Sequence, residues 1–186
     1  MQKKMLASLV LIGVALVTLG ASDSCKAPMD ATGDYTGTWS FEVTEGEGEE
    51  ATTRTVVCEG LRMTLDQDVN LDPPDNVKVT GTLFIDDYSC LDEANWPPLI
   101  PRPKPGEVAV TGTMGTNDKR IILGSGGIGT GAGAIFALDG FGESDIPAGD
   151  EIPQMTSYAG KWGLAVSVVF IGTGGVDGVF EVTRDE

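Results

Sequence analysis

The sequence contains no histidine. This excludes an imidazole base, a Ser–His or Cys–His nucleophile pair and a His-ligated metal. Basic residues are also scarce, because 12 Lys and Arg stand against 28 Asp and Glu and give a formal net charge of −16 over 186 residues. Such an excess of negative charge opposes phosphate binding, so no nucleic-acid partner is predicted.

Long apolar runs are rare as well. One run covers residues 5–19, with Lys3 and Lys4 before it and three small residues after it. A transmembrane helix needs about 20 apolar residues, and this run is shorter. A basic start, a short apolar middle and a small-residue exit predict a secretory signal peptide over residues 1–24, and a permanent membrane anchor is the alternative.

The first of only three cysteines, Cys25, directly follows this segment. Its position resembles that of bacterial lipoproteins, in which a cysteine becomes the lipidated first residue of the mature chain. The usual Leu and two small residues lie three positions early here, and Asp23 departs from the pattern. The resemblance implies a lipid anchor at Cys25 and contact with a membrane through it. Ordinary secretion, with a cut after Ala21, Ser22 or Ser24, is the alternative.

The other two cysteines, Cys58 and Cys90, form an even pair in a chain predicted to be exported. We expect the chain to be exported to the periplasm, the outer membrane or the cell surface. A cysteine pair in an exported protein predicts a disulfide. A bond that closes a loop of this length would stabilise the fold by about 3–4 kcal/mol in the chain-entropy model. A bond from Cys25 to either of them, or a bridge between molecules, is the alternative.

The rest of the chain has the period-2 alternation of β-strands. Trp39, Phe41 and Val43 share one face of the segment 38–44, and Thr or Glu residues occupy the other. Comparable segments follow at 52–57, 61–65, 77–85, 108–114, 120–123, 134–138, 162–170 and 176–183. After a tether over 25–34, we therefore predict a single all-β domain over 35–186, an antiparallel meander barrel or sandwich of about eight to ten strands.

The opening of this domain is similar to lipocalin-like and avidin-like barrels. Gly37-x-Trp39 matches their first-strand motif, and Gly81 and Gly112, in two Val-x-Val-Thr-Gly-Thr-type repeats, match later strand glycines. The resemblance implies a barrel whose opening Trp is structural. The acidic loops and the Pro-rich run depart from the pattern, so ligand binding is not carried over from it. We expect four aromatic residues to line the core or a ligand pocket: Trp39, Phe41, Trp162 and Phe170. The Pro-rich run 96–105 predicts a stiff connector packed on the barrel.

One stretch offers alternating oxygen side chains of the kind that Ca²⁺ prefers: Asp66, Asp68, Asn70, Asp72 and Asp75. The spacing does not fit an EF-hand, because Leu71 stands at the glycine position and Val77 at the position of the bidentate Glu. The stretch predicts either a calcium site or a solvated turn.

Together these features predict a protein without catalytic residues and without a cofactor other than Ca²⁺. We expect an exported envelope or surface barrel that binds a small apolar ligand or an envelope protein. The alternative is a structural subunit that self-assembles outside the cell and is stabilised by calcium.

Overall fold

The computed structural model describes residues 28–46, 48–68, 76–86, 89–91, 95–96, 106–116, 118–125, 128–129, 133–145, 152–168 and 172–186. The predicted signal peptide, Cys25, Phe170 and three of the five candidate calcium ligands (Asn70, Asp72 and Asp75) lie outside these ranges.

The described residues form nine β-strands and two short 3-10 turns. The strands are β1 (Gly33–Glu45), β2 (Thr52–Gln67), β3 (Asn76–Ile85), β4 (Gly106–Gly115), β5 (Arg120–Gly124), β6 (Ile128–Gly129), β7 (Gly133–Ser144), β8 (Met155–Val168) and β9 (Gly172–Arg184). The turns are η1 (Gly48–Glu50), between β1 and β2, and η2 (Ser89–Leu91), between β3 and β4.

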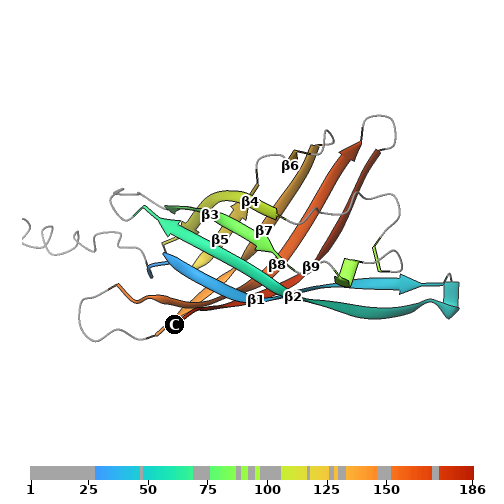
Figure 1. Cartoon of the computed structure of the whole chain (residues 1–186), viewed down its shortest axis with the longest axis horizontal. Helices are drawn as coiled ribbons and strands as arrows, with labels where there is room; N and C mark the ends of the chain where they lie inside the picture. Colours follow the sequence, from blue (N-terminus) through green and yellow to red (C-terminus); the bar gives the residue numbers. More distant parts are fainter. Residues whose placement is uncertain are drawn as a thin grey trace, which may run out of the picture.

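The sheet closes on itself (Figure 1). Its order is β5-β4-β3-β2-β1-β9-β8-β7-β6, every paired strand is antiparallel, and β5 also pairs with β7. Eight strands therefore form a continuous meander, and the two-residue β6 pairs with β7 beside it. The predicted all-β fold is confirmed, and of the two architectures expected, the chain adopts the barrel.

The barrel is apolar inside and polar outside. Alternate residues of each strand enter one buried cluster, while outward positions carry mainly Thr and charged side chains, such as Asp34, Arg62, Asp66, Lys78, Arg120, Lys161, Asp177 and Glu181. Within the described ranges, no helix is long and apolar enough to cross a membrane.

Strand β2 keeps one face inward from Val56 to Gln67 despite an interruption at Gly60. The pairing with β1 shifts between Gly37 and Trp39, and Gly60 adopts a φ of 76°. This is a β-bulge at a glycine, the residue that reaches positive φ most easily. The bulge resets the alternation, so that the segments expected at 52–57 and 61–65 form one continuous strand.

Glycines at inward positions let neighbouring strands approach closely. A Cβ on Gly112 would lie 1.7 Å from the carbonyl oxygen of Ile122, and one on Gly178 would lie 1.8 Å from that of Ser40. Such glycines allow the strong coiling that barrel closure requires. The two similar sequence segments that end around Gly81 and Gly112 are the adjacent strands β3 and β4.

One end of the barrel, here called the floor, is closed by the segment that precedes β1. Met29 and Ala31 are fully buried, and Asp30 forms a parallel bridge with Gln154 next to β8. The Ala31 amide donates to Gln67 Oε1 at 2.9 Å. The described part of the expected tether is therefore packed against the barrel, because its two apolar side chains complete the core there.

Candidate functional site

The opposite end of the barrel, here called the aromatic end, carries a cluster of five rings. Trp39 and Phe41 come from β1, Phe136 from β7 and Trp162 from β8, while Trp96 comes from the β3–β4 connection. Trp39 meets Trp162 edge-on at 4.9 Å between centroids, and Phe136 stacks on Trp162 at 5.9 Å. Phe41 contacts Trp96 at 5.6 Å. The chain has three tryptophans, and all of them belong to this cluster.

Strand lengths place this cluster near the end of the closed barrel. On one side β3 ends at Ile85, β4 begins at Gly106 and β5 ends at Gly124, whereas the β1–β2 and β8–β9 hairpins continue further. Figure 1 shows these two hairpins extending beyond the barrel in diverging directions. Inward-facing residues of both hairpins thus border the aromatic end.

Exposure of the inward-facing side chains increases from the floor to the aromatic end. At the floor, Met155 and Tyr158 have no exposed surface. At the aromatic end, Val56 on β2 is 7% exposed and Val176 on β9 is 8% exposed, and Val43 and Val108 are only partly buried. These four valines are here called the apolar rim, and two of them, Val43 and Val108, keep part of their surface accessible to solvent.

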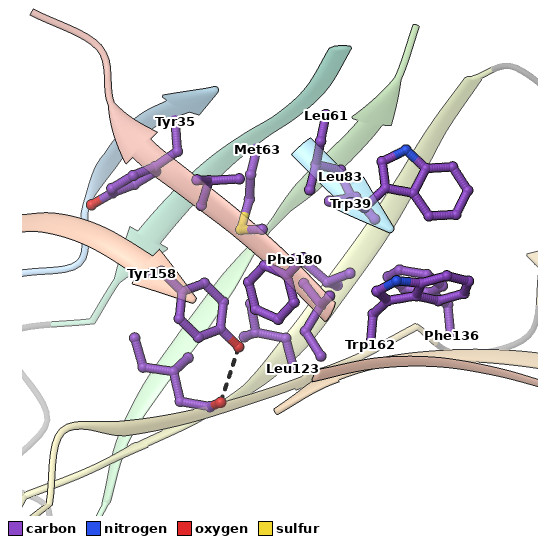
Figure 2. Packing of buried hydrophobic residues seen from close by; sticks show 14 of the residues in the cluster. Tyr35, Trp39, Leu61, Met63, Leu83, Leu123, Phe136, Tyr158, Trp162 and Phe180 are labelled. Atoms are coloured by element: carbon purple, nitrogen blue, oxygen red, sulfur yellow. Dashed lines mark hydrogen bonds between the residues drawn. The ribbon is translucent and has the colours of Figure 1, made fainter. Parts of the chain in front are cut away.

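The two barrel tryptophans differ in the state of their indole N–H. Trp162 Nε1 donates to the Ser40 carbonyl oxygen at 2.9 Å, a bond from β8 to β1 that skips over β9. Trp39 Nε1 is buried and has no hydrogen-bond partner. Figure 2 shows the Trp39 nitrogen on the side of its ring turned away from Trp162 and Phe136. Trp39 is 2% exposed, so its N–H is a buried donor without an acceptor.

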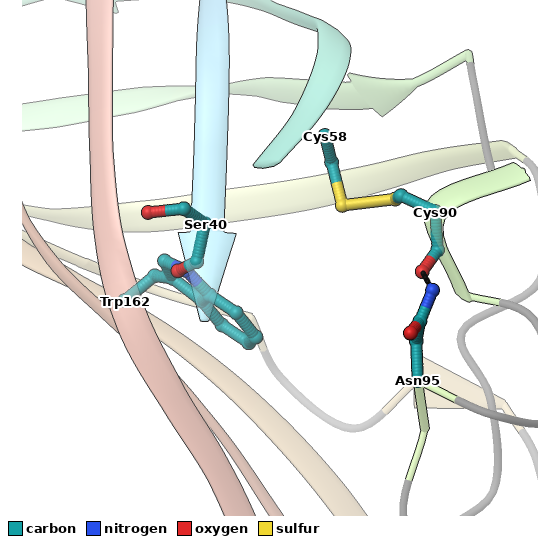
Figure 3. Close-up of a disulfide and its surroundings, with 5 residues drawn as sticks. All are labelled: Ser40, Cys58, Cys90, Asn95 and Trp162. Atoms are coloured by element: carbon teal, nitrogen blue, oxygen red, sulfur yellow. Dashed lines mark hydrogen bonds between the residues drawn. A yellow bond between two sulfur atoms is a disulfide. The ribbon is translucent and has the colours of Figure 1, made fainter. Parts of the chain in front are cut away.

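A disulfide ties η2, in the β3–β4 connection, to strand β2. Cys58 on β2 bonds to Cys90 in η2, with 5.5 Å between their Cα atoms, so the predicted disulfide is confirmed (Figure 3). Asn95 Nδ2 donates to the Cys90 carbonyl oxygen at 3.1 Å, and Arg54 hydrogen-bonds to the Asn95 side-chain oxygen. Leu91 and Trp96 are buried as a result.

The floor carries two buried tyrosines. Tyr35 donates to the Ala31 carbonyl oxygen at 2.9 Å, and Tyr158 donates to that of Ile121 at 3.0 Å. Burial raises the pKa of Tyr35 to about 12 and also raises the pKa of Tyr158. Both phenols are therefore neutral structural donors at ordinary pH. The Tyr158 bond joins β8 to β5, and the Tyr35 bond holds the segment that precedes β1.

Charged side chains lie on the outer wall. Arg120 on β5 forms two hydrogen bonds with the Asp139 carboxylate on β7, at 2.8 and 2.6 Å, and these bonds lower the pKa of Asp139. Arg62 and Asp86 form a second exposed pair. Among the described residues, no Asp, Glu, Lys or Arg is buried, and the buried polar residues are Gln67 and Ser125.

The candidate calcium ligands are only partly described. Asp66 ends the outward face of β2 and Asp68 follows the strand, and both are exposed. Within the described ranges, no three Cys, Asp or Glu side chains are placed to hold a metal ion. The other three candidates lie outside those ranges, so the calcium site stays a prediction.

The structure brings together three of the four aromatic residues that the sequence singled out. Trp39, Phe41 and Trp162 are neighbours and all are buried. Phe136 and Trp96 complete the cluster and were not among the expected residues. Phe136 could have been found from the alternation of its strand, since Phe136 and Leu138 share a face. Nothing in the sequence around Trp96 places it against Phe41.

Comparisons of the chain with protein-family models, with curated proteins and with solved structures find no match.

Proposed function

We propose that this chain is an exported, non-enzymatic binding protein that takes a small apolar ligand at the aromatic end of its barrel. The observation that carries the proposal is the difference between the two ends. The floor is filled by fully buried side chains, whereas the aromatic end combines five buried rings with two partly exposed valines, Val43 and Val108. Small-molecule sites are typically lined by apolar and aromatic side chains with few polar groups.

The distribution of charge supports a role in binding rather than in catalysis. A general acid or base would need a titratable side chain close to a bound substrate. The aromatic cluster instead lies in a core where no Asp, Glu, Lys or Arg of the described chain is buried, and the sequence has no histidine.

Export and the lipid anchor form part of the same proposal, and the disulfide is compatible with an oxidising compartment. The test is the intact mass of protein purified from the envelope of a producing bacterium. We expect a chain that begins at Cys25 with the mass of attached acyl chains. A mature chain that begins at residue 22, 23 or 25 without added mass would indicate ordinary secretion, and an intact residue 1 would contradict cleavage of a signal peptide.

Binding is tested with N-phenyl-1-naphthylamine, an uncharged fluorescent probe that accepts excitation energy from tryptophan. Because all three tryptophans lie in the cluster, we expect saturable quenching of their emission at one probe per chain. The test variant is Val43→Glu, which places a charge on the apolar rim. We expect its dissociation constant to rise at least about tenfold, since an apolar ligand would then contact a carboxylate.

The control variant is Phe141→Ser on the outer wall, where Phe141 is 57% exposed. It removes an apolar side chain far from the rim and should leave binding unchanged. The unfolding midpoint of each variant is measured to check that the variant is folded. Absence of saturable binding, or a loss of binding in Phe141→Ser but not in Val43→Glu, would refute the site proposed here.

A further inference from the structure

The unpartnered N–H of Trp39 restricts the chemistry of the ligand. Across the described chain, two buried side-chain polar atoms have no hydrogen-bond partner: Trp39 Nε1 in the aromatic cluster and Gln67 Nε2 at the floor. Leaving a buried donor unpaired costs more than an average hydrogen bond contributes. Buried tryptophans therefore usually find an acceptor, as Trp162 does with Ser40.

The neighbours of Trp39 within the cluster offer no acceptor. Trp162 meets it edge-on with ring planes 71° apart, and Phe41 lies 6.2 Å away by centroids. Cys58, on the strand next to Trp39, has its sulfur committed to the disulfide. The donor thus belongs to a largely hydrocarbon environment at the end of the barrel where the proposed ligand enters.

We infer that the ligand carries an uncharged hydrogen-bond acceptor, such as a ketone, ester or ether oxygen, and that Trp39 Nε1 donates to it. The inference rests on the proposed function. An indole N–H donates and never accepts, so the ligand has to supply the lone pair. The described core contains no buried Lys or Arg that would neutralise an anion, and a buried unpaired charge is strongly disfavoured.

The acceptor reaches this nitrogen only when the ring cluster rearranges, because Trp39 is 2% exposed. Four of the five rings belong to strands of the barrel wall, and Trp96 belongs to the β3–β4 connection. We place ligand entry beside Trp96, because this ring of the cluster does not belong to a strand of the barrel wall.

The test compares two probes of similar shape, 2-acetylnaphthalene, which has a carbonyl oxygen, and 2-ethylnaphthalene, which has none. Dissociation constants are measured by calorimetry for the wild type, for Trp39→Phe and for the matched control Trp162→Phe. For each protein we take the ratio of the dissociation constants of the two probes, and we compare this ratio between the proteins. The free energy of hydration of the probes is the same in every ratio and therefore cancels. We expect Trp39→Phe to reduce the preference for the ketone by about tenfold, and Trp162→Phe to leave it unchanged.

A second readout does not depend on how either variant folds. In the wild-type protein, the three indole ¹⁵N–¹H resonances can be followed during each titration. We expect the Trp39 proton to shift downfield with the ketone and not with the hydrocarbon. If neither probe binds, the proposed function fails. If both bind while the preference survives Trp39→Phe, or the Trp39 proton responds equally to both, the inference about the acceptor is overturned and the binding site stands.

Discussion

The close approach of β5 to Gly112 makes a sharp prediction about barrel closure. Replacing Gly112 by Ala would place a Cβ 1.7 Å from the Ile122 carbonyl oxygen and 2.9 Å from Leu123 Cα. Both contacts are with backbone, which cannot rotate away as a side chain can. Strand β5 would have to retreat by more than about 1 Å to restore ordinary contact distances.

This movement of β5 would affect one of the shorter strand pairings of the barrel. The β4–β5 ladder has four residue pairs, from Thr111↔Gly124 to Met114↔Ile121. Weakening its hydrogen bonds, each worth about 0.5–1.5 kcal/mol, and loosening the buried Ile121 and Leu123 should together cost at least about 3 kcal/mol of unfolding free energy.

The matched control is Gly163→Ala on β8. A Cβ at Gly163 meets no atom within 4 Å. This change should leave stability within about 0.5 kcal/mol, or raise it by up to about 1 kcal/mol through the reduced entropy of the unfolded chain. Urea unfolding followed by tryptophan fluorescence measures both variants. A Gly112→Ala protein whose stability matches that of Gly163→Ala would refute the idea that inward glycines are needed for closure.

Three further predictions follow from the same structure. Replacing Cys58 and Cys90 by Ala should lower the unfolding free energy by about 3–4 kcal/mol, measured against the oxidised wild type in urea, and an unchanged midpoint would contradict a structural role for the bond. Because burial raises the pKa of Tyr35 to about 12 and also raises that of Tyr158, the unfolded chain loses these protons first, from about pH 10. Stability should therefore be constant below that pH and fall as pH rises above it, and ultraviolet titration in which every tyrosine of the folded protein ionises near pH 10 would count against this. Trp162→Phe should destabilise more than Trp39→Phe, by about 1–3 kcal/mol in thermal or urea unfolding, since only Trp162 donates a hydrogen bond; equal losses would indicate that Trp39 Nε1 is also bonded in the free protein.

The sequence allowed most of the wall of the barrel to be predicted. Alternation such as Trp39, Phe41 and Val43 identifies a strand with one buried face, because side chains in a strand alternate sides. The disulfide was predictable from the even number of the remaining cysteines and from the predicted signal peptide, without any knowledge of geometry. Both are local or compositional signals that do not depend on how distant segments meet.

The features that define the candidate site depend on tertiary contacts instead. The pairing of β5 with β7, past the short β6, decides that the sheet closes, and no local pattern specifies it. Met29 and Ala31 looked like part of a polar tether, and only the shape of the floor explains their burial. Trp96 begins the Pro-rich run, and its contact with Phe41 is a tertiary contact between segments far apart in the sequence.

The burial of Met29 also sets how far the protein could stand from a membrane. Four peptide steps separate Cys25 from Met29, and a fully extended chain advances at most about 3.6 Å per residue. In a form lipidated at Cys25, the floor would therefore be held within about 15 Å of the lipid headgroups. The aromatic end lies at the opposite end of the barrel. In such a molecule the proposed ligand site would lie at the end of the barrel farther from the anchor.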